Sequence, residues 1–432
     1  MRKLAIKSRM FFIFIADIAI SIVALFLMLL FRYGTENVAT QWSTHFIPFI
    51  FASLIFTITF YIFNLYSFRF NKNITEFIGS FIKSIIIGLC FSILIFYIFG
   101  DFFKLTPKTN LLIFTSIFGI IDFYFRIKIK RYFDRQGFNR KIILIAEEEN
   151  NLIQEIKDNK NAGYTTIDTL KVLDIDKIFS QNPDLIVTDA VKENKQIFTL
   201  MKKGVFVYTI KNFYEEVFQK IPIKDISKEE ALHYVLQNKT VFNFFKRSLD
   251  IVLSVTLFVI FIPIFILLAI AIKVTSKGPV FFKHKRISLN DEEFIIYKFR
   301  SMYIDAEKNG AVWTKDNKTD VRITPVGRFI RETHLDEIPQ LINIIKGDLS
   351  FVGPRPERPE FTPQLSKDIQ YYDLRHSVKA GLTGWAQVNY KYGASTEDAL
   401  EKLKYDFYYI KNRNIFFDIL IILKTIAKIF NY

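Results

Sequence analysis

The sequence contains a single cysteine, Cys90, which lies inside an apolar run. One thiol excludes a disulfide framework and every zinc site that is built on a CxxC pair. The polar region 280–395 contains no cluster of histidine and cysteine either, so it offers no set of zinc ligands. We therefore expect the soluble parts of the chain in the cytoplasm.

A glycine-rich phosphate-binding loop is also missing where a dinucleotide-binding domain would have one. The segments "RKIILIAEEEN", "NPDLIVTDA" and "KGVFVYTI" predict three strands with helices between them, the pattern of a parallel α/β sheet. After the first strand stand Ala146, Glu147, Glu148 and Glu149 in place of GxGxxG. Glycines let the backbone approach a pyrophosphate, whereas three glutamates would repel one. We predict that residues 136–240 form a Rossmann-like cytoplasmic domain with a scaffold or regulatory role and no nucleotide at this position.

Apolar residues are abundant: half of the 432 residues are hydrophobic and 48 are phenylalanine. Four segments are long and apolar enough to cross a bilayer, namely about 10–31, 46–66, 80–100 and 110–127. The first run is too long for a signal peptide, and no small-residue cleavage site follows it. Residues 1–135 are therefore predicted to form a four-span transmembrane module.

The net charge of +15 would suggest nucleic acid in a soluble domain. Here the basic residues flank apolar segments, which favours anionic lipid headgroups and topology signals over nucleic acid. They gather before the first span, between the second and third, and after the fourth; examples are Arg9, Arg69, Lys72 and Arg135. The loop after the third span has Lys104 and Lys108 against Asp101. Both ends of the module are therefore predicted on the cytoplasmic side.

Two acidic residues, Asp17 and Asp122, fall inside predicted spans. A carboxylate in mid-membrane costs about 3 kcal/mol on insertion scales, so each needs an explanation. Arg126 follows Asp122 by four residues, which predicts an ion pair along one helix. Asp17 has no obvious partner in the sequence; helix packing and a substrate pathway are both open, and we favour packing.

A further apolar run covers about 246–272, with lysine and arginine on both flanks and Pro263 inside. Basic residues at both ends favour a segment that enters the membrane and returns, and a proline bends a helix. The alternative is an ordinary kinked fifth span. The final segment, 415–430, mixes apolar residues with Asp418, Lys424 and Lys428, which predicts an amphipathic helix on the membrane surface.

The chemistry is concentrated in "HLDEIPQL", where Asp336 and Glu337 are adjacent. Basic residues stand around this pair in neighbouring motifs: Lys298, Arg300, Arg322, Arg328, Arg331 and Arg355. Such a density of cations beside two acids predicts a polyanion site with its own acid group. Helix capping on a soluble face is the simpler alternative.

Adjacent carboxylates repel each other, and a divalent cation would relieve this conflict while it binds a diphosphate. Mg²⁺ suits carboxylate and phosphate oxygens better than zinc does, so we predict Mg²⁺ at Asp336 and Glu337. Pro339 and the apolar spacing that follows it predict a helix, with the acids at or near its N-terminus. A carboxylate that is kept ionised there can attack phosphorus.

These motifs resemble a known family. "KFRSM", "RITPVGRFIRETHLDEIPQLINIIKGDLSFVGPRPE" and "GLTGWAQVNY" together are similar to the bacterial sugar transferases, the polyprenyl-phosphate hexose-1-phosphate transferases. The resemblance is strong over 241–432, and the first 235 residues are similar to the N-terminal half of the large members.

The resemblance implies a membrane α/β protein with a mostly helical catalytic domain, 241–432, held by a re-entrant hairpin kinked near Pro263. It implies transfer of a hexose-1-phosphate from a UDP-sugar to undecaprenyl phosphate, with Asp336 as nucleophile and Glu337 as its assistant. Arg331, Arg355 and Lys298 match family positions around the phosphates, and we assign Arg300 to the same group. A homodimer in the bacterial inner membrane, with the catalytic domain on the cytoplasmic face, is also expected.

Some features depart from the family pattern or stay open. The turn "ISLNDEEF", 287–294, lacks the usual glycines, and His284 replaces a glutamine. Trp385 could pack in a core or face a membrane or a base, and His334 and His376 are expected to be structural. The sugar is not predicted. An inactive membrane scaffold is the alternative function, and a lipid-phosphate phosphatase is disfavoured because the expected histidine is missing.

Overall fold

The structure is a computed structural model. It describes all residues except 1, 64, 67–73, 104–107, 136–139, 148–150, 160–163, 190–194, 238, 305, 307–319, 391–392, 394 and 431–432. Arg69, Lys72, Lys104, Glu148 and Glu149, which support predictions above, lie outside the described residues.

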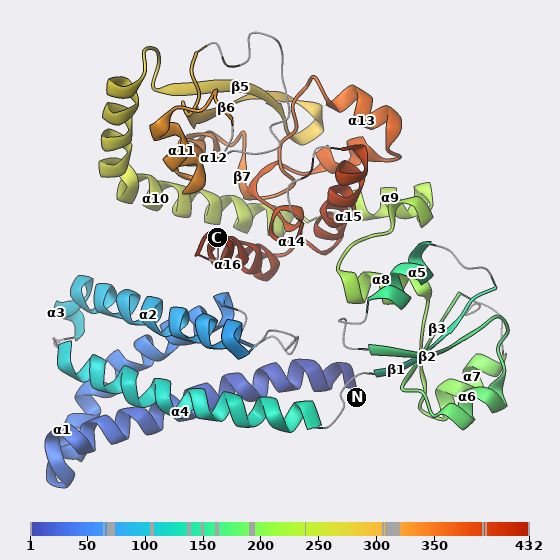
Figure 1. The fold of residues 1–432 in the computed structure, drawn as a ribbon, viewed down its shortest axis with the longest axis horizontal. Helices are drawn as coiled ribbons and strands as arrows, with labels where there is room; N and C mark the ends of the chain where they lie inside the picture. The colour runs from blue at the N-terminus through green and yellow to red at the C-terminus, as the bar shows by residue number, and fades with distance from the viewer. Residues whose placement is uncertain are drawn as a thin grey trace. The chain divides into compact units, whose positions relative to one another are not determined.

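The first part of the chain is helical, in agreement with its apolar composition (Figure 1). Its helices are α1 (Arg2–Ile62), α2 (Ile74–Ile98), the short α3 (Gly100–Phe103) and α4 (Lys108–Arg135). Among the described residues, three helical stretches have the length and hydropathy to cross a membrane: Phe11–Ile62, Phe77–Ile98 and Thr240–Thr275. The chain is therefore a membrane α/β protein, while the count of four spans stays a prediction.

The helix α1 is too long for one crossing. Its apolar stretch of 52 residues would measure about 78 Å as a straight helix, against about 30 Å for the hydrocarbon core. Gly34 interrupts the helical conformation with φ 73° and ψ 169°, a conformation that glycine adopts without strain. The two halves of α1 correspond to the first two predicted spans.

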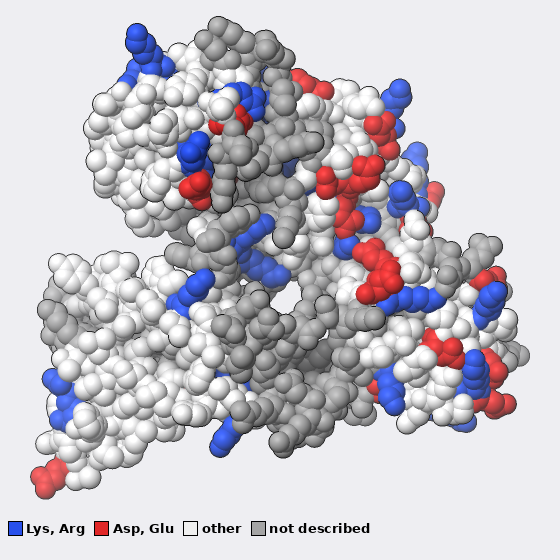
Figure 2. Space-filling view, in the orientation of Figure 1, with Lys and Arg blue, Asp and Glu red and all other residues white. Residues whose placement is uncertain are grey.

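The helices α1, α2 and α4 pack around a core that is rich in phenylalanine and includes Phe56, Phe60, Phe81 and Phe118. Many large apolar side chains of this module are exposed, among them Phe31, Tyr97 and Phe102, and the face drawn in Figure 2 shows few charged side chains among its described residues. A protein that is apolar inside and outside fits a lipid environment.

The polar groups of this module are joined by Arg126, which is 2% exposed. Its Nε donates to Asp122 Oδ2 and its Nη2 to Asp17 Oδ2, both at 2.7 Å, and its Nη1 donates to the Leu65 carbonyl at 2.8 Å. The hydroxyl of Tyr66 also donates to Asp17. The predicted Asp122–Arg126 pair is present, and the partner of Asp17 that the sequence did not reveal is the same arginine. These contacts favour the packing explanation of Asp17.

A four-stranded sheet follows, in the order β2-β1-β3-β4. Its elements are β1 (Arg140–Ile145), α5 (Asn151–Asp158), β2 (Tyr164–Leu170), α6 (Ile175–Gln181), β3 (Leu185–Thr188), α7 (Lys195–Lys202) and β4 (Phe206–Tyr208). β1 and β2 are parallel, as expected for strands joined by helices. Ile143, Ile186, Ile178 and Leu200 form part of its core, so α6 and α7 cover one face.

The chain forms two compact units. One holds most of residues 1–207, and the other holds residues 208–432 with the short segments 149–156 and 187–193. The predicted boundaries at 135 and 240 stay predictions. The second unit contains α8 (Ile210–Phe218), η2 (Ile223–Asp225), α9 (Lys228–Val235), α10 (Thr240–Thr275), β5 (Phe281–Ile287), η3 (Leu289–Asp291), β6 (Glu293–Phe299), α11 (Pro325–Glu332), η4 (Leu335–Glu337), α12 (Gln340–Lys346), β7 (Ser350–Val352), α13 (Thr362–Asp368), η5 (Tyr372–Ser377), β8 (Gly381–Thr383), α14 (Trp385–Asn389), α15 (Thr396–Asn412) and α16 (Ile415–Phe430).

The helix α10 is the apolar element of this unit. It continues through Pro263 without a break, and Figure 1 shows that it bends part-way along its length. A proline inside a helix removes one backbone donor and bends the helix, which accounts for the kink. The expected kink near Pro263 is present, and it lies inside one continuous helix.

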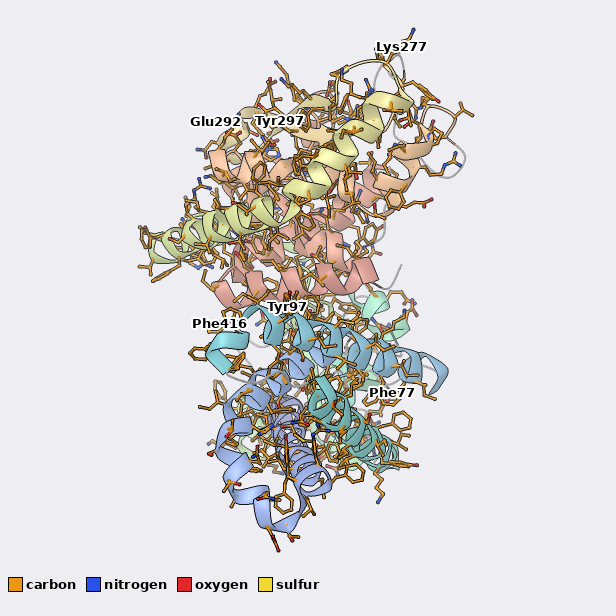
Figure 3. All side chains as sticks on the ribbon, turned by 90° about the vertical axis from the view of Figure 1, so that its left-hand side faces the viewer. Phe77, Tyr97, Lys277, Glu292, Tyr297 and Phe416 are labelled. Carbon is orange, nitrogen blue, oxygen red and sulfur yellow. The ribbon has the colours of Figure 1, made fainter. Side chains whose placement is uncertain are left out.

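Both ends of α10 are bound to the same globular domain. At the N-terminal end, Lys246 pairs with Asp418 at 2.6 Å, and Arg247 donates to the carbonyls of Ile344 and Ile345. At the C-terminal end, Arg300 donates to the carbonyls of Ser276 and Lys277, the latter labelled in Figure 3. These contacts favour the re-entrant interpretation over a fifth span, because a crossing helix would place its two ends on opposite sides of the membrane.

The helix α16 exposes apolar residues and turns polar ones inward. Asp418 is 1% exposed, and Lys428 donates to the carbonyl of Gln387 at 2.8 Å. In contrast, Phe416, labelled in Figure 3, is 86% exposed, and Ile419 is also exposed. The helix predicted for 415–430 is present, and its location on a membrane surface stays a prediction.

The contacts of Arg126 predict a large loss of stability when this arginine is replaced. Arg126→Leu leaves two buried carboxylates without their cation, and such a loss typically costs about 3–5 kcal/mol. We expect a clearly lower unfolding temperature of the detergent-purified protein, measured by thermal shift. Lys128→Leu, which removes an exposed charge from the same helix, is the matched control and is expected to leave the temperature unchanged. Equal temperatures for both variants would contradict the role given to Arg126.

Candidate active site

The acidic pair lies on a tight turn between two short helices. α11 begins with Thr324 as its N-cap and Pro325 in its first turn, and it ends at Glu332. His334 then adopts φ 57°, a left-handed conformation that redirects the chain into the 3-10 turn η4. Asp336 and Glu337 follow in this turn, just before α12 begins at Gln340. The prediction that the acids precede a helix is therefore confirmed.

The two acids have different surroundings. Glu337 Oε1 accepts from Lys298 Nζ at 2.6 Å and from Arg355 Nη2 at 3.1 Å, so two cations converge on one oxygen. Asp336 is 8% exposed, and its carboxylate has no hydrogen-bond partner within the part of the chain that the structure describes. Two of the predicted cations thus meet the acidic pair, but they bind Glu337.

This asymmetry separates the pKa values of the pair. Burial raises the pKa of Asp336, and the neighbouring Glu337 adds to the effect, although Lys298 and Arg331 oppose it. Burial alone would also raise the pKa of Glu337, but Lys298 and Arg355 outweigh it and the pKa lies below its usual value. Glu337 is therefore the ionised member, and the charge of Asp336 depends on the cations around it.

Arg331 lies near Asp336 and is a cation without an ion-pair partner among the described residues. It is available to an anion that approaches the pair. The predicted phosphate ligand Arg300 has a different place: it is 5% exposed, and its bonds go to the C-terminal carbonyls of α10. A guanidinium there interacts favourably with the helix dipole, so the assignment of Arg300 to the phosphates is not supported.

The turn that carries Arg355 packs against the second glycine-rich motif. β7 and β8 are parallel, and Gly353 donates to the Thr383 carbonyl while Gly381 donates to the Pro354 carbonyl, both at 2.9 Å. A Cβ on Gly353 would lie 2.3 Å from the Lys379 carbonyl oxygen, so only glycine allows this approach. The motifs "VGPRP" and "GLTG" are therefore two halves of one packing contact.

A buried arginine, Arg375, holds this turn in place. Its Nη2 donates to the Arg355 carbonyl at 3.0 Å and to Asp406 Oδ2 at 2.9 Å, and its Nη1 donates to the Tyr372 hydroxyl. The side chain is 5% exposed. The backbone of Arg355 is thus fixed from behind by an ion pair with α15, which leaves the Arg355 side chain directed at Glu337.

Another arginine of the site, Arg286, was missed in the sequence. It is the penultimate residue of β5 and donates through Nη1 to the Pro356 carbonyl at 3.3 Å, one residue beyond Arg355. Ile287 donates to the carbonyl of Glu357 in the same contact. The motif "HKR" offered the signal, but nothing in its spacing placed it beside Arg355.

The donor set suits a hard cation. Asp336 offers a carboxylate that no described group binds, and Glu337 keeps its second oxygen, Oε2, outside the bonds to Lys298 and Arg355. Two adjacent carboxylates with oxygen ligands to spare are what Mg²⁺ uses when it also binds phosphate. The residues therefore fit the predicted ion.

The turn between β5 and β6 has no glycine, and other residues adopt the left-handed backbone conformation in it. Asn290 and Asp291 have φ 56° and 61°, the left-handed region that glycine would favour. Short polar side chains tolerate this conformation better than others do. Asp291 also accepts from His376 Nδ1 at 2.6 Å, so this histidine has a structural contact as expected.

Trp385 is 1% exposed and lies in the core, which settles the alternatives left open for it.

Comparison with known proteins agrees with these motifs. The family model "Bacterial sugar transferase" matches residues 241–432. A putative undecaprenyl-phosphate N-acetylgalactosaminyl 1-phosphate transferase of Bacillus subtilis is 39% identical over 153 residues, which are 35% of this chain and 84% of that protein. The chain belongs to the bacterial sugar transferase family.

Two other family members match over a smaller share of their length. A UDP-N-acetylgalactosamine-undecaprenyl-phosphate N-acetylgalactosaminephosphotransferase of Aeromonas hydrophila is 41% identical over 223 residues, 52% of each chain. A UDP-glucose:undecaprenyl-phosphate glucose-1-phosphate transferase of Escherichia coli is 40% identical over 187 residues, 42% of this chain and 39% of that protein. The chain thus spans about half, or less, of the length of these two relatives.

The contacts of Arg375 predict that it stabilises the candidate site. Arg375→Met leaves Asp406 buried without a cation, which typically costs about 3–5 kcal/mol. We expect a lower unfolding temperature and faster proteolysis near the 354–358 turn. Lys285→Met removes one partner of the exposed Lys285–Glu293 pair in the same domain and is expected to change neither. Intact protease resistance in Arg375→Met would refute the positioning role.

Proposed function

We propose that this protein transfers a hexose-1-phosphate from a UDP-sugar to undecaprenyl phosphate and releases UMP. The observation that carries the proposal is Asp336, a buried carboxylate without a bonding partner among the described residues, next to Glu337 and its two cations. The printed names of the relatives support the class of reaction, and they differ in the sugar, N-acetylgalactosamine or glucose. The sugar that this chain uses is not part of the proposal.

The reaction proceeds in two displacements. An oxygen of Asp336 attacks the phosphorus that carries the sugar; the new O–P bond forms as the bond to the UMP phosphate breaks, and UMP leaves with the electron pair. A phosphate oxygen of the lipid then attacks the aspartyl phosphosugar, and the carboxylate of Asp336 is regenerated. Neither step consumes or releases a proton when the carboxylate form of Asp336 and the lipid phosphate attack as anions.

The neighbouring residues make this possible for two anions in turn. Lys298 and Arg331 lower the pKa of Asp336 against the larger effect of burial, and they would neutralise the phosphate that it attacks. Asp336 and Glu337 would hold Mg²⁺, which supplies positive charge against the phosphate oxygens. The kinked α10 would place the site at headgroup level in the bacterial inner membrane, with the catalytic domain on the cytoplasmic side. A homodimer remains a prediction.

Replacement of the nucleophile tests the proposal. The protein in detergent with undecaprenyl phosphate, Mg²⁺ and a panel of UDP-sugars is expected to release UMP with at least one sugar. Asp336→Asn is expected to lower the rate by at least about three orders of magnitude, and chelation of Mg²⁺ should stop it. Absence of release with every sugar would favour the inactive scaffold. Release that survives in Asp336→Asn would keep the transferase and exclude this nucleophile.

The pKa shifts predict a change in the pH dependence. Lys298 lowers the pKa of Asp336, so Lys298→Met is expected to raise this pKa. When the pH is lowered, Asp336 of the variant is then protonated at a higher pH than in the wild type, and the rate begins to fall earlier. The pH–rate profile of UMP release is expected to show its acid limb displaced to higher pH. Lys346→Met is the control, because Lys346 lies beside Tyr297, on the face of β6 opposite to Lys298. An unchanged limb in Lys298→Met would show that another ionisation controls the rate.

A further inference from the structure

Arg286 has a guanidinium edge that none of the described residues binds. Its Nη1 donates to the Pro356 carbonyl, while Nε is sealed from solvent without a hydrogen-bond partner. Nη2 has no partner either among the described residues. Nε and Nη2 form the edge of arginine that binds phosphate or carboxylate with two parallel hydrogen bonds. A buried donor without a partner is unfavourable, which indicates that this edge is built for a ligand.

The position of Arg286 relative to Lys298 follows from the β5–β6 pairing. Arg286 pairs with Phe294 and Phe282 pairs with Lys298, so the two cations are separated by four residues along the ladder. An even separation places both side chains on the same face, roughly 13 Å apart at the backbone. Glu337 and Arg355 lie in the interval, because Lys298 binds Glu337 and Arg286 binds the residue after Arg355. The site is therefore a row of cations that begins at Lys298 and ends at Arg286.

The charges along this row fall into two groups. Those that act on Asp336 come from Lys298, Glu337, Arg331 and His334. Those that act on Arg286 come from Arg355, Glu357, Arg358 and again Glu337. Arg286 lies beside the turn that carries Arg355, four residues along the ladder from Lys298.

The positive charges near Arg286 repel its guanidinium, and this repulsion favours the binding of an anion. Burial and the nearby Arg355 lower the pKa of Arg286 to about 10. The guanidinium therefore stays charged at neutral pH, although burial and Arg355 both disfavour its charged form. Glu357 opposes this effect, yet its carboxylate accepts from the backbone of Arg358 and forms no bond to Arg286. An anionic ligand would relieve the repulsion among these arginines.

A sugar nucleotide carries two phosphates, and the proposed reaction treats them differently. The phosphate next to the sugar is attacked by Asp336, and the phosphate of UMP leaves from the opposite side, because attacking and leaving oxygens are roughly in line. Groups that hold the leaving phosphate must therefore lie farther from Asp336 than Lys298 and Arg331 do. Arg286 meets this condition.

We propose that Arg286, together with Arg355, binds the phosphate that departs with the nucleotide. Its free edge holds two oxygens of that phosphate, and its charge stabilises the negative charge that develops on the leaving oxygen. This inference rests on the proposed function. It assigns the ligand by chemistry, a nucleoside monophosphate or the corresponding half of a diphosphate.

Binding of UMP tests this assignment without any turnover. UMP is titrated into the full-length protein in detergent by calorimetry. Arg286→Gln is expected to weaken UMP binding about ten- to a hundred-fold, since it removes charged hydrogen bonds. Arg286→Lys keeps the charge but loses the two-point edge, so an intermediate loss is expected. Lys285→Gln has the same change in net charge one residue away, on the opposite face of β5, and should bind UMP as the wild type does.

The outcomes separate this inference from the proposed function. Equal UMP affinity in Arg286→Gln and wild type, or no UMP binding by the wild type, overturns the subsite. If Arg286→Gln does not fold, the comparison of Arg286→Lys with Lys285→Gln decides in the same way. A raised KM for undecaprenyl phosphate with unchanged UMP affinity would assign Arg286 to the acceptor and also overturn it. UMP binding that depends on Arg286 in a protein that releases no UMP would keep the subsite and reject the transferase.

Discussion

Two adjacent acidic side chains in a partly buried turn are the constraint around which the domain that carries the candidate site is arranged. Neither Asp336 nor Glu337 could be ionised in that position without nearby positive charge, since burial disfavours a carboxylate. Lys298 supplies one charge from β6, and Arg355 supplies another from the turn after β7. Each of these cations must also be held in position, and contacts with neighbouring elements do this.

The support for Arg355 shows how far this requirement reaches. Its backbone is bound by Arg375, whose charge is balanced by Asp406 on α15, and its turn can approach β8 only because Gly353 and Gly381 lack side chains. Segments from 286 to 406 thus contribute to the position of one guanidinium. Precise placement of a charge group requires several elements at once.

The sequence was informative where local patterns decide the structure. The apolar runs predicted the helices of the membrane module, the spacing of Asp122 and Arg126 predicted their pair, and Pro339 with its apolar spacing predicted the helix after the acids. The α/β segment was recognised from alternating strands and helices. Each of these features depends on residues within a few positions of one another.

Partners that are distant in the sequence could not be found in this way. Asp17 meets Arg126 across 109 positions, and Lys298 meets Glu337 across 39. Arg300 matched the pattern of a phosphate ligand by its neighbours, yet tertiary packing directs it to the end of α10. Arg286 became visible only when β5 was placed beside the Arg355 turn. Motif spacing identified the kinds of residue in the site, and the fold decided which ones meet.

The apolar helix α10 and the turn that carries Asp336 share one small apolar core. Leu268 and Ile272 of α10 pack with Phe299, Ile330 and Leu335, and Leu335 directly precedes Asp336. Asp336 is therefore linked by packing to α10 and keeps a constant height above whatever layer this helix enters. Under the proposed function, the encounter with an acceptor confined to that layer becomes a search in two dimensions, in which lateral diffusion replaces diffusion through the solution. The water-soluble donor gains nothing from this arrangement, so the anchor acts on only one of the two substrates.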